Sequence, residues 1–283
     1  MKKILITGAN SYIGVSFENY IKKNDSETYL IDTVDMIDGS WKNKDFSIYD
    51  AVFHVAGIAH QKETSENEHL YYEINRDLAV ETAKKAKEEG VKHFLFLSSM
   101  SVYGVDSGVI TKDTVPFPKS HYGKSKWQAE EQLAALQDDE FTVALIRPPM
   151  VYGKGCKGNF QTVVKIVKKF PVFPKVKNQR SMIYIDTLCQ YVKEFIDRGA
   201  SGVLLPQNAE YMNTSEMALA IAERLGKKIH LSRILGFAVK VMCPFVSVAN
   251  KAFGNLVYEK DDKVKTIKKT TEKTNRESVL ESV

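Results

Sequence analysis

The sequence predicts an α/β protein built on a doubly wound parallel sheet, and three observations lead to this prediction. Short apolar runs alternate with longer segments of helical periodicity from the N-terminus to about residue 205. The first apolar run is followed directly by a glycine turn and then by a helical pattern. After residue 205 the alternation weakens, which indicates a smaller C-terminal subdomain.

Composition narrows the class of protein. The 283 residues are 43% apolar and 27% charged, which is ordinary for a soluble globular protein. The net charge is +5, and many lysines lie in residues 260–273, so a concentrated face for nucleic acid is not expected. The three cysteines, Cys156, Cys189 and Cys243, show neither metal-ligand spacing nor a disulfide framework, which favours a cytoplasmic protein.

Two apolar segments need to be tested against the patterns of signal peptides and transmembrane helices. At the N-terminus, two lysines precede only three apolar residues before Thr7, which is too short for a signal peptide. Residues 234–253 are apolar but interrupted by Lys240 and Pro244, so we expect no transmembrane segment. We predict a buried or interfacial helix pair there. A membrane-surface helix and a contact with a membrane-bound partner remain alternatives.

The glycine turn predicts a dinucleotide site. Residues 3–7 read as a strand, residues 8–14 as the turn, and residues 15–23 as a helix. This layout brings a diphosphate to a helix N-terminus, where backbone N–H groups and the helix dipole favour negative charge. The usual middle glycine is replaced by Ser11, which either crowds the phosphates or donates its hydroxyl to one of them.

The next strand, residues 29–36, carries two candidate acids for the adenosine ribose. A carboxylate at the end of this strand binds the ribose of NAD and repels the extra phosphate of NADP. Asp32 lies at the expected distance from Gly8, but Asp35, followed by Met36, is also suitable. The chain before residue 50 is too short for a further helix and strand, so we expect a compressed connection.

Residues 50–57 form an apolar strand that ends in Val55, Ala56 and Gly57, whose small side chains let a cofactor approach the backbone. His54 lies within this strand and is interpreted as a core residue. His60 follows in a loop and is a candidate for the substrate cleft, although an ordinary loop histidine is equally compatible.

A pair of motifs in the middle of the chain predicts proton-transfer chemistry. Residues 91–97 read as a buried strand that opens into Ser98 and Ser99, and Tyr122 and Lys126 lie one turn apart on a predicted helix. Free tyrosine titrates near pH 10, and a neighbouring ammonium group lowers that pKa. Ser99 is placed to share the transferred proton.

These segments, taken together, resemble a known family. The motifs are Thr7-Gly8 to Gly14, residues 53–57, Asn75, residues 98–104, Tyr122-x-x-x-Lys126, and residues 147–153 with Pro148. Six motifs in this order resemble the extended short-chain dehydrogenase/reductase family, in its NAD-dependent epimerase/dehydratase branch acting on nucleotide sugars. The resemblance implies a Rossmann-type fold and NAD as the cofactor.

The resemblance also implies roles for individual residues. The catalytic residues are Ser99, Tyr122 as acid and base, and Lys126, which holds the nicotinamide ribose and lowers the Tyr122 pKa. The cofactor-binding residues are Gly8, Asn10, Ser11, Tyr12, Ile13, Gly14, Asp32, Asp35, Met36, Val55, Ala56, Gly57, Asn75, Tyr122, Lys126 and Pro148. The substrate-binding residues are His60, Ser101, Asn159, Phe173 and Arg180.

The residues after Ser99 bear on the reaction. Dehydratases of this branch typically carry an Asp-Glu pair there, whereas this chain has Met100 and Ser101, neither of which is a useful acid. This argues against 4,6-dehydration. Epimerisation and 4-keto reduction need the same three residues, and we predict a UDP-glucose or UDP-GlcNAc 4-epimerase working through a 4-keto sugar because it is the commoner activity among sequences with this resemblance. An NAD(P)H-dependent 4-keto sugar reductase of surface polysaccharide synthesis is the alternative, and a non-catalytic NAD-binding scaffold is the alternative of another class.

The expected division into parts follows from these assignments. Residues 1–153 form the dinucleotide-binding domain, and residues 182–204, read as a strand and a helix, return to it. Residues 154–181 and 205–283 form the substrate-binding subdomain and a charged C-terminal tail, which we interpret as a solvated or frayed helix. The resemblance implies a homodimer. We expect no metal and no nucleic-acid partner.

Overall fold

The computed structural model describes residues 1–59, 61–243, 245–260 and 273–283. The chain divides into two units that interleave in sequence. The first unit contains residues 1–104, 116–148 and 188–206, and the second contains residues 105–115, 149–187 and 207–283. Compared with the predicted division, the break lies at Pro148 instead of residue 153, and residues 105–115 fall in the second unit.

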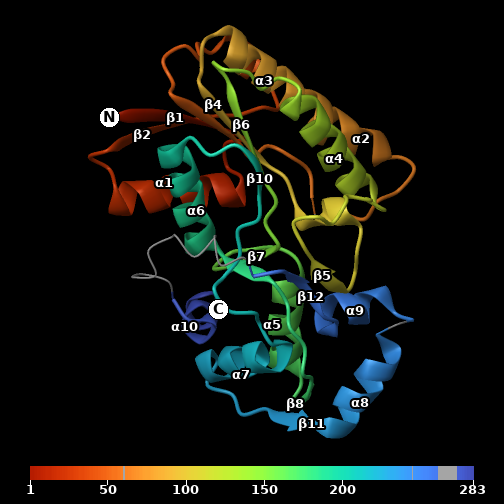
Figure 1. Ribbon diagram of the computed structural model, residues 1–283. Coiled ribbons are helices and arrows are strands. Elements are labelled where there is room, and N and C mark those ends of the chain that lie inside the picture. Colours follow the sequence, from red (N-terminus) through yellow and green to blue (C-terminus); the bar gives the residue numbers. More distant parts are fainter. Residues whose placement is uncertain (60, 244, 261–272) are drawn as a thin grey trace. The chain divides into compact units, whose positions relative to one another are not determined.

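The first unit is built on a parallel sheet of six strands (Figure 1). In spatial order these strands are β10 (Gly202–Leu204), β6 (Thr142–Ile146), β4 (His93–Leu97), β3 (Ala51–His54), β1 (Lys2–Thr7) and β2 (Tyr29–Val34). Every pairing between neighbours is parallel. Parallel strands need crossover connections, so helices cover both faces of such a sheet.

Helices lie on both sides of this sheet (Figure 1). They are α1 (Tyr12–Asn24), α2 (Glu68–Tyr72), α3 (Leu78–Glu88), α4 (His121–Ala134) and α6 (Ile185–Arg198). Alternate strand residues point to opposite faces. Val52 and Phe94 therefore share a core with Ala83 of α3 and Leu133 of α4, whereas Phe53 packs edge-on against Phe17 of α1. The predicted doubly wound sheet is confirmed.

The connection between β2 and β3 is compressed, as expected. It contains one short 3-10 turn, η1 (Ser40–Asn43), and no α-helix or strand. The usual dinucleotide-binding sheet has one more strand beyond β2. In this sheet β2 is instead the edge strand.

The helical segment between β3 and β4 has an irregular middle. Its central turn is a π-helical segment, η2 (Glu73–Asp77), inserted between α2 and α3. Such π-helical insertions are rare and occur frequently at functional sites. This one contains Asn75, whose side chain is fully buried.

The carboxyl ends of the central strands meet at one edge of the sheet. The chain goes from β1 outward to β2 on one side and then crosses to β3 on the other, so the topological switch point lies between β1 and β3. Ligands of open α/β sheets bind outside the carboxyl ends at such a point. Thr7, His54, Leu97 and Ile146 end the four strands concerned.

The second unit consists of two-stranded sheets and short helices. Its strands are β5 (Gly108–Ile110) with β12 (Leu256–Tyr258), β7 (Met150–Tyr152) with β9 (Met182–Tyr184), and β8 (Val172–Pro174) with β11 (His230–Ser232). Its helices are α5 (Asn159–Lys169), α7 (Thr214–Arg224), α8 (Arg233–Met242), α9 (Ser247–Phe253) and α10 (Asn275–Glu281). The second smaller unit agrees with the predicted fold class.

Two expectations for this part of the chain need correction. Of residues 182–204, the part expected to return to the first domain, residues 188–204 do belong to the first unit and end in β10, which pairs with β6, whereas the strand at the start, β9, pairs with β7. The end of the chain is helical, as expected, but this helix is neither frayed at its start nor fully solvated: α10 begins with a capping box at Thr274, and Ser278 and Val279 are buried. The part of the tail at residues 261–272 lies outside the described residues.

The helix pair predicted over residues 234–253 is present as α8 and α9. Its first member is not buried, because large apolar side chains of α8 such as Ile234 and Phe237 are exposed. Within the described ranges, no helix combines the length and the apolar character needed to cross a membrane.

Candidate active site

The glycine turn after β1 has the close approach that its sequence predicts. Gly8 adopts a left-handed backbone, with φ of 111°, and a Cβ there would lie 2.7 Å from the backbone nitrogen of Ala56. At Gly14 in α1, a Cβ would lie 2.6 Å from Ser11 Oγ and 3.2 Å from side-chain atoms of both Ile6 and Val55. Glycine at position 8 therefore lets the loops after β1 and β3 lie against each other, and glycine at position 14 leaves room for the Ser11 cap.

Ser11 caps the helix that follows the turn. Its Oγ accepts a hydrogen bond from the Gly14 N–H at 3.2 Å, which satisfies one donor of the first turn of α1. The hydroxyl proton of Ser11 has no acceptor in the described part of the chain, which favours donation to a ligand over crowding. Asn10 precedes it with φ of 64°, and Tyr12 and Ile13 begin α1.

The structure separates the two candidate acids. Asp32 lies within β2 and accepts a hydrogen bond from the Tyr49 hydroxyl at 2.6 Å. Asp35 comes directly after Val34, whose carbonyl accepts hydrogen bonds from the N–H groups of Gly8 and Ala9. Asp35 is thus the acid that follows the strand end beside the glycine turn. Met36 is buried in the main apolar core, so its side chain does not support the predicted cofactor contact.

Asn75 holds the loop that follows β3. Its Oδ1 accepts from the Ile58 N–H at 2.9 Å, and its Nδ2 donates to the Ile58 carbonyl and to Ser125 Oγ. A Cβ at Gly57 would lie 2.7 Å from Asn75 Oδ1 and 3.3 Å from Lys126 Nζ. The amide of Asn75 is fully engaged by protein, so it positions the Gly57 loop against α4.

Ser99 and Tyr122 lie together, as the sequence predicts. The Ser99 hydroxyl caps the 3-10 turn η3 (Met100–Tyr103), accepting from the Ser101 N–H at 3.1 Å and lying 3.2 Å from Ser101 Oγ. Burial raises the pKa of Tyr122, and hydrogen bonding with Ser99 lowers it. Because a hydroxyl group rotates, Ser99 can donate to either oxygen.

Lys126 is buried one turn further along α4. Its Nζ donates to the Leu97 carbonyl at 2.8 Å and lies 4.5 Å from the centre of the Phe96 ring. Burial lowers the pKa of Lys126 to about 7. The expected lowering of the Tyr122 pKa by Lys126 is not found, because that pKa is raised overall and the ammonium is directed at a backbone carbonyl.

His54 is the core residue that its position in an apolar strand indicates. Its Nδ1 lies 2.8 Å from Thr7 Oγ1, and its ring stacks between Phe94 and Phe96. Burial, with a smaller effect from the Lys126 charge, lowers the pKa of His54 to about 3. The imidazole is therefore neutral near pH 7 and adds no charge beside Lys126.

Two further groups of contacts hold the loop and the helix that carry Ser99, Tyr122 and Lys126, which we call the trio. Glu63 accepts hydrogen bonds from the N–H groups of His121 and Tyr122 at the start of α4. Behind the η3 turn, the buried Arg147 pairs with the buried Glu130 of α4 and donates to the Tyr103 hydroxyl at 2.8 Å. These contacts join β6, α4 and the η3 turn.

The comparison with protein families is decisive at this point. The model of the NAD dependent epimerase/dehydratase family matches residues 4–203. The chain belongs to this family. Membership confirms the predicted family and enzyme class and, because the family is NAD dependent, the predicted cofactor.

The chain is similar in sequence to bacterial epimerases. A UDP-glucose 4-epimerase of Vibrio cholerae is 32% identical over 252 residues, covering 80% of this chain and 76% of that one. An N-acetyl-alpha-D-glucosaminyl-diphospho-ditrans,octacis-undecaprenol 4-epimerase of Escherichia coli O157:H7 is 29% identical over 177 residues, covering 59% and 54%.

Solved structures share the fold of this family member. A UDP-glucuronic acid 4-epimerase from Bacillus cereus in complex with NAD has a TM-score of 0.74 at 19% identity, covering 99% of this chain and 96% of that chain. A dTDP-4-dehydrorhamnose reductase from Clostridium acetobutylicum has a TM-score of 0.65 at 20% identity, covering 81% and 82%. At these identities the likeness concerns the fold.

The residues at the switch point fit the cofactor of the family. The Gly8 turn leaves no room for a side chain, the first turn of α1 presents helix-terminal N–H groups, and Ser11 keeps a hydroxyl proton to donate. The Pro148 carbonyl accepts a hydrogen bond from the Met100 N–H at 3.0 Å, which joins the segment after β6 to the turn that follows Ser99. The glycine turn and the helix-terminal N–H groups are what a dinucleotide diphosphate requires.

The predicted substrate-binding residues are distributed over both units. Ser101 is exposed beside Ser99, and His60 lies outside the described residues. Asn159 is the exposed first residue of α5 in the second unit. Phe173 is fully buried against Phe253, so the prediction that its ring lines a nucleotide pocket is not supported.

Arg180 is buried in the second unit, where Nη1 donates to the Gly254 carbonyl at 3.0 Å and to the Asn250 carbonyl at 3.3 Å. Its Nε is buried and has no hydrogen-bond partner among the described residues. Burial lowers the pKa of this guanidinium. Part of the side chain is therefore already occupied by backbone carbonyls, and the Nε–H is a buried donor without a partner among the described residues.

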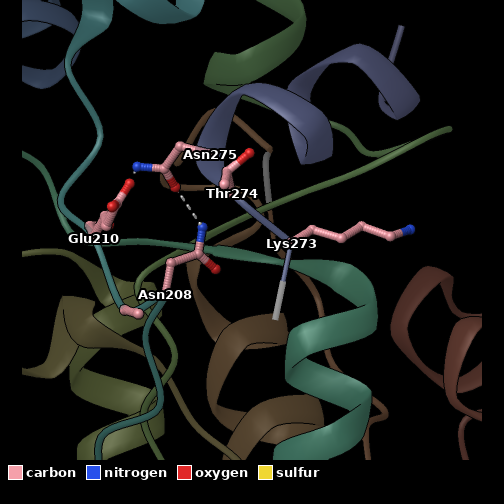
Figure 2. A pocket seen from close by; sticks show the side chains of 6 residues that line it. Asn208, Glu210, Lys273, Thr274 and Asn275 are labelled. Atoms are coloured by element: carbon pink, nitrogen blue, oxygen red, sulfur yellow. Dashed lines mark hydrogen bonds between the residues drawn. The ribbon is translucent and has the colours of Figure 1, made fainter. Parts of the chain in front are cut away.

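The second unit also has two adjoining cavities of about 100 and 400 Å³. Figure 2 shows the smaller one, where Asn208 donates a hydrogen bond to Asn275 at 3.0 Å, with Glu210, Lys273 and Thr274 around it. None of the described residues predicted as site residues lines either cavity.

Sequence reasoning missed Glu63 and the Glu130–Arg147–Tyr103 group. Arg147 was noted only as part of a family motif, and a buried acid at Glu130 on the helix of Lys126 was the available signal for its partner. Glu63 had no such signal, because it lies in a polar loop and reaches α4 across a separation of 59 residues.

Proposed function

We propose that the chain is an NAD-dependent 4-epimerase of a nucleotide sugar of the UDP-glucose or UDP-GlcNAc type. The observation that carries the proposal is the hydrogen-bonded pair of Ser99 and Tyr122, one helical turn from the buried Lys126, beside a dinucleotide-binding turn. The Vibrio cholerae UDP-glucose 4-epimerase, 32% identical over most of both chains, supports the choice of reaction.

The proposed chemistry assigns one task to each side chain of the trio. NAD, when bound, accepts the hydride from the sugar C4 and later returns it to the opposite face. Tyr122, as the phenolate, takes the proton of the 4-hydroxyl and, as the phenol, gives it back to the 4-keto oxygen. Ser99 donates to the same oxygen and shares the proton during transfer.

The protein must counteract the effect of burial on Tyr122. Burial raises the pKa of Tyr122, which disfavours the phenolate that the reaction needs, and Ser99 lowers that pKa. We propose that Lys126 adds to this lowering when its ammonium holds the nicotinamide ribose instead of the Leu97 carbonyl. Ser101, exposed beside Ser99, is the proposed contact for the sugar.

Other ligand contacts are proposed on the same basis. Asp35 is the proposed partner of the adenosine ribose, because it follows the strand end beside the glycine turn. In the second unit, Arg180 through its Nε–H and Asn159 through its exposed amide are proposed to contact the nucleotide part of the substrate.

The residues after Ser99 support epimerisation over dehydration. Met100 and Ser101 occupy the first two positions of η3, where an acid pair would be required to expel water. A 4-keto sugar reductase remains the second candidate, because it uses the same trio for half of the cycle. A solved dTDP-4-dehydrorhamnose reductase has the same fold.

One incubation separates these candidates. The purified protein is given UDP-glucose, UDP-GlcNAc or a UDP-4-keto sugar, with and without NADH. Interconversion without net NADH consumption supports the epimerase, and stoichiometric NADH oxidation supports the reductase. Binding of NAD without turnover of any sugar supports a non-catalytic scaffold.

The variant Tyr122→Phe tests the mechanism within that assay. Removing the phenol oxygen leaves the ring and deletes the proton carrier, so we expect turnover to fall by about 10²–10⁴-fold with NAD binding retained. Unchanged turnover would contradict the assignment of Tyr122 as the proton carrier.

A lipid-linked sugar diphosphate is a second candidate substrate. The Escherichia coli relative is named for a sugar joined through a diphosphate to undecaprenol. The specific observation in favour is the exposed apolar surface of α8, because a polyprenyl carrier resides in a membrane. Offering both carriers to the enzyme and comparing kcat/KM decides between them.

The remaining predictions from sequence are kept as proposals. We propose a cytoplasmic enzyme that supplies precursors for surface polysaccharides and works as a homodimer. Analytical ultracentrifugation tests the dimer, and cell fractionation tests the location.

A further inference from the structure

An unusually apolar surface lies on α8 and the turn after it. Ile234 is 82% exposed, Phe237 is 71% exposed, and Phe245 is 86% exposed. Further exposed apolar side chains of the same segment are Leu235, Val241, Met242 and Val246. Single exposed apolar residues need no explanation, but a contiguous group of this kind marks an interaction surface.

The orientation of this helix is fixed by packing. Ile234, Phe237 and Val241 are spaced three and four residues apart, so they form one stripe on the helix. Gly236 is on the other side and is the buried residue of α8, where a Cβ would lie 2.1 Å from the Lys175 carbonyl oxygen. Because α8 contacts the segment around β8 through a glycine, it cannot roll to bury its apolar stripe.

The segment around α8 carries the excess positive charge of the protein. Residues 224–258 contain no Asp or Glu and six basic residues, which are Arg224, Lys227, Lys228, Arg233, Lys240 and Lys251. The chain has 40 basic and 35 acidic residues, so the remainder has 34 and 35, a net charge of −1. The apolar stripe and the net positive charge therefore occur in the same segment.

We propose that this surface, defined by α8, Cys243, Phe245 and Val246, binds a bilayer that contains anionic phospholipids. Ile234, Phe237 and Phe245 enter the boundary between headgroups and acyl chains, and Arg233 and Lys240 contact anionic headgroups. A helix of 10 residues is about 15 Å long, which is half of a hydrocarbon core, so α8 lies in the interface and does not cross it.

The charge distribution favours a lipid over a second copy of the chain. In a twofold dimer the same patch meets itself, which would bring Arg233 and Lys240 of both copies together. Lysine is also depleted in protein interfaces. An anionic lipid surface matches both the stripe and the cations, and the proposal does not depend on which sugar reaction the enzyme performs.

The test is flotation of the full-length protein with lipid vesicles. We expect the wild type to float with vesicles of phosphatidylcholine mixed with phosphatidylglycerol and not with phosphatidylcholine alone. Ile234→Ser with Phe237→Ser should lower the partition coefficient at least about 10-fold. Arg233→Glu with Lys240→Glu should lower it at least about 25-fold, at about 5-fold per cation, and added salt should release the wild type.

Matched variants control for general loss of apolar surface or charge. Val115→Ser with Phe117→Ser removes side chains that are 77% and 76% exposed elsewhere. Lys23→Glu with Lys84→Glu reverses two exposed charges on α1 and α3. Both should float like the wild type. Circular dichroism and turnover of the water-soluble sugar nucleotide verify that every variant is folded and keep this test separate from that of the catalytic proposal.

Three results would overturn the proposal. They are absence of flotation with anionic vesicles, equal flotation of the α8 variants and the wild type, or equal flotation with neutral and anionic vesicles. A concentration-dependent dimer that Phe237→Ser disrupts, together with absence of vesicle binding, would identify a second copy as the occupant.

Discussion

Glu63 holds Tyr122 by its backbone: one carboxylate oxygen of Glu63 accepts a hydrogen bond from the Tyr122 N–H at 3.0 Å. The other oxygen accepts from the N–H of His121 at the same distance. A negative charge at this point also complements the positive end of the α4 dipole. The phenol that we propose as the proton carrier is therefore positioned through its backbone by a loop residue 59 positions away in sequence.

Replacing Glu63 by Ala should impair both the helix and the reaction. We expect the free energy of unfolding to fall by about 1 kcal/mol, as for loss of a helix cap. We expect kcat to fall at least about 10-fold with a smaller change in KM, because the phenol loses its alignment. Thermal unfolding and steady-state kinetics measure the two effects.

Two variants make the Glu63 prediction specific. Glu63→Gln keeps one oxygen acceptor and should recover most of the activity. Glu66→Ala removes an exposed acid of the same loop and should resemble the wild type. Wild-type kinetics for Glu63→Ala would contradict the positioning role.

Ser99→Ala should shift the pH dependence of the reaction upward. Hydrogen bonding with Ser99 lowers the pKa of Tyr122. Removing the Ser99 hydroxyl therefore raises that pKa and reduces the fraction of phenolate at every pH below it. The rising limb of kcat/KM against pH should move to higher pH, and activity at neutral pH should fall by about 10–100-fold. Ser99→Thr keeps the hydroxyl and should restore the wild-type limb. A limb that does not move would show that Ser99 does not act on Tyr122.

Lys126→Met should stabilise the protein more at pH 6.5 than at pH 9. The pKa of Lys126 is lowered to about 7 in the folded protein, whereas the unfolded chain binds this proton up to about pH 10.4. Below about pH 7 the folded state contains a buried ammonium and the full cost of burying it is present. Between about pH 7 and pH 10 only the unfolded chain binds the proton, so this cost decreases by about 1.4 kcal/mol per pH unit. The difference in Tm between the variant and the wild type, measured at pH 6.5 and at pH 9, tests this prediction.

The exposed Lys124, on the same helix, offers the comparison for this effect. Lys124→Met should show no pH-dependent change in Tm relative to the wild type, because an exposed lysine has a similar environment in both states. If Lys126→Met shows the same Tm difference at both pH values, Lys126 does not titrate in this range.

Asp35→Asn should weaken NAD binding and reduce discrimination against NADP. A carboxylate beside the ribose binds its hydroxyls and repels the 2′-phosphate, so its neutral isostere loses both effects. We expect the Kd for NAD to rise about 10-fold and the preference over NADP to fall by a similar factor. Calorimetric titration with both dinucleotides measures this.

Asp32→Asn provides the contrast with Asp35. Asp32 accepts from the Tyr49 hydroxyl within β2, so its replacement should affect stability and leave the preference for NAD unchanged. If the preference is lost in Asp32→Asn instead, the ribose partner is the earlier acid.

The sequence by itself determined the doubly wound sheet, the family and the trio. Apolar runs and glycine turns are local patterns, and Tyr122 and Lys126 are linked by helical periodicity alone, so none of these features needs a long-range contact to be read. The compressed connection before β3 followed from chain length. His54 followed from its place in a continuous apolar strand.

The tertiary structure decided everything that depends on which distant groups meet. Three contacts join segments that no spacing rule connects. They are the hydrogen bond of Glu63 with the Tyr122 N–H, that of Asn75 with the loop after Gly57, and the ion pair of Arg147 with Glu130. Burial decided the pKa directions of Tyr122 and Lys126, because desolvation depends on the surrounding fold. It also decided that Phe173 is buried and that the apolar stripe of α8 is exposed, since the sequence states how apolar a residue is but not whether a neighbour covers it.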